Sequence, residues 1–198
     1  MAPRLTPPLE PIDHVIGSPD ASLELVMFGD FQCPYCRVAQ PQVHQVRREL
    51  GDRLRFAFRH FPLVQMHPMA EPAAEASESA AAQGNFWAYH DALYVSQPAL
   101  SPKLLLTLAV RLGLDAEQLA QDLEQRRWRP RVARDLESGM ASGVGGTPTF
   151  FVNGRLHQGD YDAASLVAAL GATVAPRTAP RQSMPHGPQP GAPPPPPG

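Results

Sequence analysis

The sequence predicts an α/β fold in which a mixed sheet is flanked by helices and interrupted by an inserted helical block. Three observations lead to this prediction: two strand-like runs enclose an amphipathic helix, a long helical stretch follows, and a hairpin signal comes near the end. Strands and helices that alternate along a chain are typical of α/β domains. At 198 residues, the chain is long enough for one well-buried domain with an insertion.

The first three elements follow from the spacing of apolar residues. Residues 23–28 form a short apolar run, which predicts a mostly buried strand. From residue 34 to residue 50 apolar side chains recur at nearly helical spacing, and Pro41 is expected to kink this helix. Residues 54–59 alternate apolar with polar or small side chains, so they predict a second strand.

The later elements follow from breaks and turns. Residues 66–142 are predicted to be helical almost throughout, in segments separated by glycine, proline and N-capping residues. Residues 149–152 and 155–157 then predict two strands, because the Asn153-Gly154 pair between them is the strongest short-range hairpin signal. A last helix is expected over residues 162–170. The order is therefore strand, helix, strand, helical block, hairpin and helix.

These expectations divide the chain into five parts. In order, they are an extended, proline-rich arm (1–14), the first half of the sheet domain (15–65), the helical insertion (66–142), the second half of the sheet domain (143–171) and a proline-rich tail (172–198). The composition of the tail predicts disorder or polyproline II structure.

Composition and charge exclude several classes of partner. The formal net charge of -2 and a pI close to 6.4 give no electrostatic basis for binding nucleic acid or an anionic membrane. No apolar run approaches the roughly 20 residues of a membrane-spanning helix, so membrane insertion is not expected. Residues 1–8 contain no continuous apolar segment, so no secretory signal is expected and the predicted location is cytoplasmic.

The two cysteines of the chain, Cys33 and Cys36, stand three positions apart where the first helix is predicted to begin. A helix start presents free N–H groups and a partial positive charge, which stabilise a thiolate at Cys33. The thiolate is the reactive form, and Cys36, one turn further along, can attack a mixed disulfide formed there. Pro34 suits the first helical position, where its missing N–H is no loss. The pair therefore predicts a dithiol–disulfide couple.

Two other interpretations of the cysteine pair stay open. Half of a structural zinc site would need further ligands, and none of the seven histidines has the spacing expected of a zinc finger. A site that uses His60 and His67 is one form of this alternative, although a packing role is the default for both. A buried, inert pair is the other. No metal and no cofactor are predicted.

The segment before the predicted hairpin carries a second signal. Thr147-Pro148 follows two glycines and precedes a strand, a context that suits a cis bond in a tight turn. Such a bond would expose the backbone of Thr147 instead of pairing it within the sheet.

With these motifs, the chain resembles the thioredoxin superfamily and specifically its DsbA-like branch, in which a helical block is inserted into the thioredoxin fold. The resemblance spans about residues 12–171, and Pro41 matches the helix-kinking proline of the superfamily. Its matching segments, in consistent order, are residues 28–36, 59–63, 67–68, 83–87 with 90–91, and 146–154. The implied fold is a thioredoxin-like mixed sheet flanked by helices, with an inserted helical subdomain.

The resemblance implies a thiol–disulfide oxidoreductase that exchanges disulfides with protein or peptide substrates and with a redox partner. It makes Cys33 the exposed nucleophile and Cys36 the buried resolving thiol. An extended substrate would dock beside Cys33, as in strand addition. The residues implied to bind it are Pro34, Tyr35, Thr147 and the cis-proline Pro148.

One position departs from that pattern. Met27 stands where thioredoxins and many DsbA proteins carry a buried carboxylate that handles the proton of the second cysteine. Water or another group must then deprotonate Cys36. Glu24 could take this proton only if its side chain turned inward. The default interpretation is that Glu24 is a solvated strand residue.

Two alternative functions accompany the favoured one. They are a glutathione-dependent isomerase or transferase with the same fold, and a non-catalytic zinc-binding or adaptor protein. Elsewhere, the five arginines within residues 126–134 predict a solvated, salt-bridged helix face.

Overall fold

The computed structural model describes residues 3–173, which form a five-stranded sheet with helices on both faces. The strand order is β1-β3-β2-β4-β5. The strands are β1 (His14–Ile16), β2 (Leu23–Gly29), β3 (Leu54–His60), β4 (Thr149–Val152) and β5 (Arg155–Leu156). The tail predicted over residues 172–198 lies, from residue 174 on, outside the described residues.

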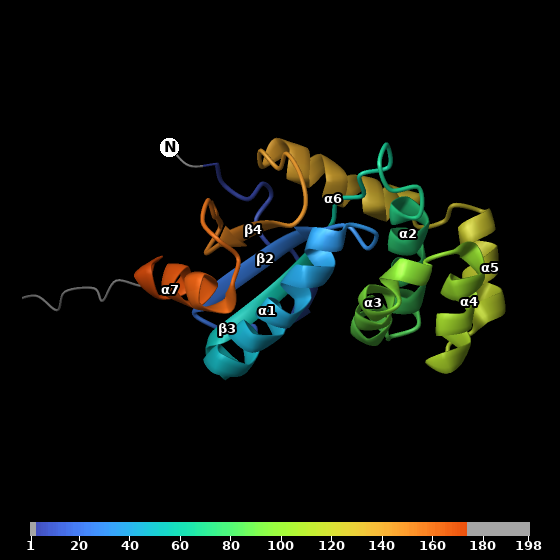
Figure 1. The fold of residues 1–198 in the computed structure, drawn as a ribbon, viewed down its shortest axis with the longest axis horizontal. Helices are drawn as coiled ribbons and strands as arrows, with labels where there is room; N and C mark the ends of the chain where they lie inside the picture. Colours follow the sequence, from blue (N-terminus) through green and yellow to red (C-terminus); the bar gives the residue numbers. More distant parts are fainter. Residues whose placement is uncertain (1–2, 174–198) are drawn as a thin grey trace, which may run out of the picture.

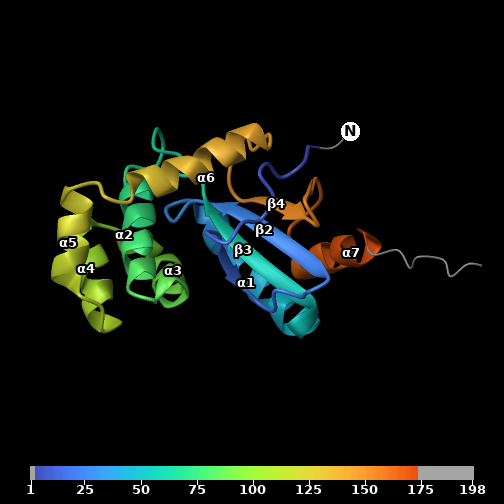
Figure 2. The ribbon, with the colours of Figure 1, turned by 180° about the vertical axis from the view of Figure 1, so that it is seen from behind.

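Helices α2 (Ala70–Ala82) to α5 (Ala116–Glu124) stand beside one end of the sheet and α7 (Ala163–Thr173) lies at the other end, while α6 (Arg129–Ala141) runs back along the edge of the molecule toward β4 (Figures 1 and 2). The predicted α/β class with a mixed sheet and a helical insertion is confirmed. The helices are α1 (Pro34–Leu50), α2 (Ala70–Ala82), α3 (Phe86–Val95), α4 (Pro102–Arg111), α5 (Ala116–Glu124), α6 (Arg129–Ala141) and α7 (Ala163–Thr173), with 3-10 turns η1 (Gly51–Arg53) and η2 (Gln97–Ala99).

Strand β2 lies at the centre of the sheet because it is apolar on both faces. It pairs in parallel with β3 and antiparallel with β4. Leu25 and Met27 face the core that α1, α3 and α7 cover, whereas Val26 and Phe28 face a second core beneath α6. The loop that carries the two cysteines leaves the end of this buried strand, which gives the loop a rigid base.

The predicted hairpin is confirmed as β4 and β5. Asn153 and Gly154 between them have φ angles of 48° and 73°, the left-handed pair that a tight two-residue hairpin requires. The Asn-Gly signal therefore also identified the backbone conformation of this turn.

Strand β1 was missed from the sequence, and the arm that precedes it is docked on the sheet. Three residues are too few to show an alternating pattern, but β1 pairs antiparallel with β3. The buried guanidinium of Arg59 on β3 holds the arm, because it donates to the carbonyls of Pro7 and Pro8 and binds the Asp13 carboxylate at 2.7 and 2.8 Å. Leu5 is buried in the second core.

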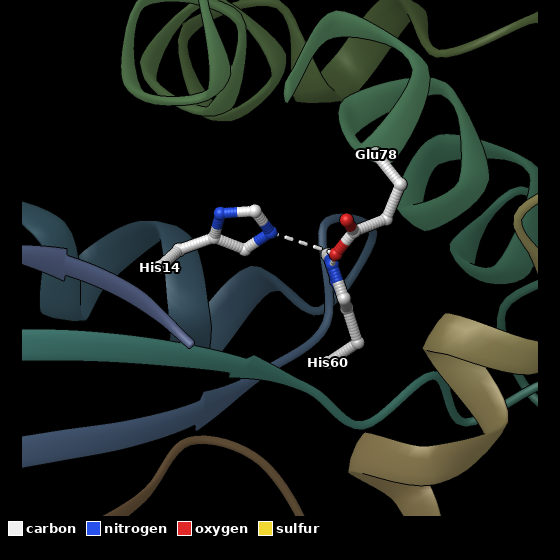
Figure 3. Close-up of side chains that lie close together, drawn as sticks. All are labelled: His14, His60 and Glu78. Atoms are coloured by element: carbon white, nitrogen blue, oxygen red, sulfur yellow. Dashed lines mark hydrogen bonds and ion pairs between the residues drawn. The ribbon is translucent and has the colours of Figure 1, made fainter. Parts of the chain in front are cut away.

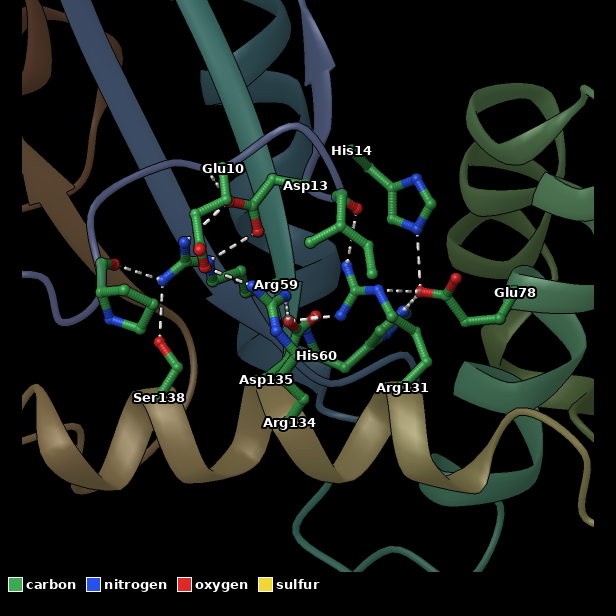
Figure 4. Close-up of polar contacts among 12 residues, drawn as sticks. Glu10, Asp13, His14, Arg59, His60, Glu78, Arg131, Arg134, Asp135 and Ser138 are labelled. Carbon is green, nitrogen blue, oxygen red and sulfur yellow. Dashed lines mark hydrogen bonds and ion pairs between the residues drawn. The ribbon is translucent and has the colours of Figure 1, made fainter.

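The prediction of a solvated arginine face on residues 126–134 was wrong in part. Arg131 is only 8% exposed and forms an ion pair with the buried Asp135 one turn along α6. Figure 4 shows the side chains of Arg131, Asp135 and Ser138 pointing from α6 toward the arm and β3. This side of α6 closes the second core, so its charges are paired in the interior.

Candidate active site

The two cysteines stand where β2 passes into α1. Cys33 is the N-cap of α1, with an extended backbone (φ -72°, ψ 120°), and Pro34 occupies the first turn of the helix. Cys36 lies one turn along, and the two cysteines are 3.9 Å apart as free thiols. The helix start therefore presents both sulfur atoms at the same end of the sheet.

The Cys33 sulfur is more recessed than expected. Cys33 was expected to be exposed, but it is only 3% exposed, and Cys36 is fully buried. The reason is the direction of the Cys33 thiol, which points across to the loop before β4 instead of outward. Pro34 is exposed beside it, and Tyr35 is 65% exposed.

The Thr147 carbonyl accepts a hydrogen bond from the Cys33 thiol. Cys33 Sγ donates to the Thr147 carbonyl oxygen at 3.3 Å across 114 positions of sequence. The Thr147–Pro148 peptide bond is cis, and both residues are half-buried directly before β4. The structure thus brings together all of the residues proposed from the sequence for the site: Cys33, Pro34, Tyr35, Cys36, Thr147 and Pro148.

The surroundings separate the acidities of the two thiols. The hydrogen bond from the Cys36 thiol, then those from the Thr147 side chain and from the Cys36 and Tyr35 backbone, lower the pKa of Cys33 to about 5 despite partial desolvation. Burial and the adjacent Cys33 sulfur raise the pKa of Cys36 well above its usual value. At neutral pH the pair therefore holds one thiolate, at Cys33, and one thiol.

Gln97 of η2 clamps the loop that carries the cysteines, and no sequence pattern marks this residue. Its side-chain Nε2 donates to the carbonyl oxygens of Phe31 and Cys33, both at 2.9 Å, and the residue is buried. Through this contact the insertion fixes the backbone of Cys33. A glutamine after a helix is common, so only the fold reveals this role.

A second set of contacts holds the loop at Asp30. The buried Asp30 carboxylate accepts from the backbone N–H groups of Gln32 and Leu63 at 2.7 and 2.9 Å and pairs with His67 Nδ1 at 2.7 Å. The Asp30 N–H in turn donates to Cys36 Sγ at 3.5 Å. His67, expected to have a packing role, is thus two hydrogen-bonded steps from the Cys36 sulfur.

Met27 and Glu24 leave Cys36 without a nearby acidic side chain on β2. Met27 is fully buried, and its sulfur accepts from Gln40 Nε2 at 3.7 Å. Glu24 pairs with Arg55 at 2.6 Å near the start of β2, roughly 16 Å of strand from the end that carries the cysteines. Glu24 is therefore a sheet residue and does not serve the site.

His14, His60 and Glu78 form a cluster with the donor types of a metal site (Figure 3). Both histidine Nε2 atoms lie 2.8 Å from the same oxygen, Glu78 Oε1. Arg131 Nε stands 3.8 Å from that oxygen, however, and its fixed positive charge opposes a divalent cation there (Figure 4). The contacts fit a buried carboxylate satisfied by hydrogen bonds.

A zinc site that joins the histidines to the cysteines does not fit the geometry of the described residues. His60 binds Glu78, whereas His67 binds Asp30, so the two rings belong to separate clusters. Neither histidine hydrogen-bonds to Cys33 or Cys36 in the contacts described above. Within residues 3–173, the group of side chains that could hold a metal ion is His14, His60 and Glu78, so no third or fourth zinc ligand joins the cysteine pair there.

Comparison with protein families decides the relationship that the fold suggests. A family model described as Thioredoxin matches residues 10–172. The chain belongs to the thioredoxin family. Within it, the structure of BdbD from Bacillus subtilis is similar to this thioredoxin-family chain with a TM-score of 0.72 and 25% identity, over 80% of this chain and 90% of BdbD.

Other solved structures support the DsbA-like branch. A thioredoxin-like oxidoreductase from Silicibacter pomeroyi has a TM-score of 0.71 and 29% identity, over 83% of this chain and 93% of that protein. The α-DsbA1 protein of Wolbachia pipientis shares the fold with a TM-score of 0.72 at 19% identity, over 83% of this chain and 92% of that protein. This thioredoxin-family chain therefore has the DsbA-like fold with its helical insertion.

Curated relatives with higher identity carry a different name. The Na+/H+ antiporter NhaA 1 of Salinispora arenicola is 45% identical over 158 residues, which are 80% of this chain but 24% of the antiporter. The antiporter NhaA of Herminiimonas arsenicoxydans is 45% identical over 85% of this chain and 27% of its own length. This chain thus spans about a quarter of these relatives. Within residues 3–173, the structure contains no helix with the length and apolar character to cross a membrane.

Proposed function

We propose that this protein is a thiol–disulfide oxidoreductase that exchanges disulfides with protein or peptide thiols through Cys33 and Cys36. One observation carries the proposal. The Cys33 sulfur, with a pKa lowered to about 5, lies against the Thr147 carbonyl, while Cys36 stays buried as a thiol behind it. A low-pKa thiolate paired with a resolving thiol is the chemistry of disulfide exchange.

The exchange runs in two displacement steps. In the oxidised protein, a substrate thiolate attacks Cys33, the Cys33–Cys36 bond breaks, and Cys36 leaves with the electron pair and takes a proton. A second substrate thiolate then attacks the substrate sulfur of the mixed disulfide and releases Cys33 as a thiolate. Two substrate thiols become one disulfide, and the protein gains two electrons. The reverse sequence reduces a substrate disulfide.

The substrate is proposed to lie along the loop before β4. Thr147 and Pro148 are half-buried there, and Pro34 and Tyr35 border the opposite side of Cys33 on an exposed surface. An extended peptide in this place can bring its sulfur toward Cys33 while its backbone meets Thr147. Because Cys33 is recessed, the peptide must approach closely, which favours flexible or unfolded substrates.

A cytoplasmic location is part of the proposal. Both cysteines of the chain belong to the redox pair, so neither is left for a structural disulfide, as is usual in reducing compartments. Ion transport, which names the antiporter relatives, is not proposed, because this chain matches only about a quarter of their length. Cell fractionation of the full chain tests the location.

Capture of a mixed disulfide tests the function. Cys36→Ser should react with a peptide that carries one disulfide and accumulate a covalent adduct at Cys33, because the resolving thiol is missing. Wild-type protein should turn the same peptide over without a lasting adduct, and the matched control Cys33→Ser should form none at all. Mass spectrometry before and after treatment with a small dithiol identifies the adduct.

The same preparation separates the alternative functions. Near-stoichiometric zinc in the purified wild-type protein, with both thiols resistant to alkylation, would show a zinc-binding or adaptor protein instead. Consumption of glutathione without disulfide exchange on the peptide would show a glutathione-dependent isomerase or transferase.

A further inference from the structure

To resolve a mixed disulfide at Cys33, Cys36 must become a thiolate, although its buried surroundings disfavour the charge. Cys36 is fully buried, and its burial raises the pKa of its thiol well above the usual value. Met27 supplies no charge or proton there, and Glu24 is engaged with Arg55. The Asp30 N–H donates to Cys36 Sγ at 3.5 Å, but the pKa of Cys36 stays raised in spite of it, so a second donor would help to stabilise the Cys36 thiolate when the mixed disulfide is resolved.

Tyr94 of α3 has a buried hydroxyl that forms no hydrogen bond with the other described residues. The residue is 2% exposed, and among the described residues its Oη atom has no hydrogen-bond partner. A buried hydroxyl without a partner is unfavourable. By contrast, the Tyr89 hydroxyl one turn earlier donates to the Leu105 carbonyl at 2.8 Å. The burial of the Tyr94 hydroxyl without a partner among the described residues is therefore costly for stability, which suggests a functional role for it.

The position of this hydroxyl is next to the resolving cysteine. A side chain at Gly29 would come within 2.9 Å of Tyr94 Oη, so the hydroxyl lies directly against the last residue of β2. The next residue, Asp30, donates its N–H to Cys36 Sγ at 3.5 Å. Tyr94 Oη and Cys36 Sγ thus flank the same short stretch of backbone. Glycine at position 29 permits this close approach.

The Tyr94 ring is held in place and its hydroxyl stays protonated. The rings of Phe31 and His90 each lie with their centroids 5.1 Å from that of Tyr94. Burial, and then the negative charges of Cys36 and Asp30, raise the pKa of Tyr94 well above its usual value. The hydroxyl is therefore a donor throughout the physiological range of pH.

We propose that the Tyr94 hydroxyl donates a hydrogen bond to the Cys36 thiolate as it forms and so takes the place of the buried carboxylate that Met27 replaces. The inference rests on the proposed disulfide exchange. In the step concerned, the Cys36 thiol loses its proton to solvent or a buffer base. The resulting thiolate, stabilised by Tyr94 O–H, attacks Cys33 in the mixed disulfide. The Cys33–substrate bond breaks, the Cys33–Cys36 bond forms, and the substrate leaves as a thiolate.

In the described part of the chain, six other ionisable groups lie around Tyr94 and Cys36. They come from the active-site loop and from α1 and α3, which border the same cavity, and they are Asp30, Cys33, Arg37, His44, His90 and Asp91. Burial lowers the pKa of His90, so this ring stays neutral near pH 7. Each of these groups is unchanged in the variants below, so a shift between variants reports the Tyr94 hydroxyl.

Reaction with dithiobis(nitrobenzoate) separates the two cysteines in the full chain. Cys33 attacks the reagent in a phase that depends on reagent concentration, and it releases one coloured thiolate. Cys36 then closes the Cys33–Cys36 disulfide in a first-order phase and releases a second. The pH profile of the second phase therefore reports the ionisation of Cys36, and the first phase reports Cys33.

In Tyr94→Phe, the profile of the second phase should move up by about one pH unit, the size of one hydrogen bond to a charged group. Near neutral pH the second phase should slow by about threefold, because a smaller thiolate fraction is partly offset by a more nucleophilic thiolate. The first phase should stay unchanged. A ring-fluorinated tyrosine at position 94, a stronger donor of the same shape, should move the profile in the opposite direction.

Tyr89→Phe is the matched control, because it removes a buried hydroxyl from the same helix at a position bonded to Leu105. It should leave the second-phase profile in place. An unchanged profile in Tyr94→Phe, or an equal shift in Tyr89→Phe, would overturn the inference while both phases in wild type still support disulfide exchange. If Tyr94→Phe does not fold, the protein with fluorinated tyrosine at position 94 tests the inference by itself. An unchanged second-phase profile in that protein would also overturn the inference. Absence of the first phase in wild type would instead sink the proposed function.

Discussion

The Cys33 sulfur and the Thr147 carbonyl oxygen lie 3.3 Å apart, although the two residues are 114 positions apart in the chain. The contact joins the start of α1 to the loop before β4, so it links the two halves of the sheet domain at the cysteine pair in addition to the pairing of β2 with β4. The contact also turns the thiol inward, which makes Cys33 recessed. The Cys33 thiolate is stabilised by other groups, first of all by the hydrogen bond from the Cys36 thiol.

The acidity of Cys33 is the first prediction. Alkylation of reduced protein by iodoacetamide should show a titration midpoint near pH 5 at Cys33, because hydrogen bonds from Cys36 and Thr147 lower its pKa to about 5. Cys36→Ala removes the largest of these contributions, so the midpoint should move upward. Mass spectrometry assigns the label, and Cys33→Ala is the control. A midpoint of wild-type Cys33 above pH 8 would contradict the site as described.

The reduction potential is the second prediction. A pKa of about 5 for Cys33 lies about two units below that of thioredoxin, and each unit stabilises the reduced form by about 30 mV for two electrons. Starting from about -270 mV for thioredoxin, the expected potential is roughly -210 mV. Equilibration in glutathione redox buffers, read by mass spectrometry of the trapped forms, measures it. A potential at or below that of thioredoxin would show that the thiolate is not stabilised.

The stability of the reduced protein should depend on pH through Cys33. The pKa of the Cys33 thiol is about 5 in the folded protein, against 9.0 for an ordinary cysteine, so between these pH values the unfolded chain binds more protons. Stability from this group is therefore fully present above pH 9 and is lost as the pH falls toward 5. Urea unfolding of wild type and Cys33→Ser under reducing conditions checks the sign. The difference between them should grow as pH rises through this range.

The Gln97 clamp should matter for both stability and exchange. Gln97→Leu removes the donor to the Phe31 and Cys33 carbonyls and leaves two buried acceptors without it. The expected loss in free energy of unfolding is about 1–3 kcal/mol, with slower reaction at Cys33. Gln45→Leu, on the exposed face of α1, is the matched control and should change neither. Equal effects from both variants would refute the clamp.

The arm should detach when Arg59 is lost. Arg59→Leu leaves the Asp13 carboxylate buried without its cation and releases the Pro7 and Pro8 carbonyls. Breaking one partner of a buried ion pair costs about 3–5 kcal/mol, so the midpoint of urea unfolding should fall accordingly. Proteolysis within residues 3–13 should become faster than at other sites. Arg48→Leu, an exposed arginine of α1, serves as the control.

Local chemistry was enough to predict most of the fold. The apolar run of β2, the helical spacing of α1 and the Asn153-Gly154 turn depend on residues close together in sequence, and each is present as predicted. The cysteine pair at the helix start is likewise local. Strand β1 was missed because three residues carry no pattern, and the docking of the arm depends on Arg59, far along the chain.

The fold class and the proposed pair of cysteines could be predicted from the sequence, because periodicity, turn residues and helix starts act over a few neighbouring positions. The contacts that hold the site became visible in the folded chain: the Thr147 carbonyl accepts from the Cys33 thiol, Gln97 clamps the Cys33 backbone, and Tyr94 lies against the strand end beside Cys36. These contacts join segments tens of residues apart, and their hydrogen bonds depend on direction and burial that no local pattern records.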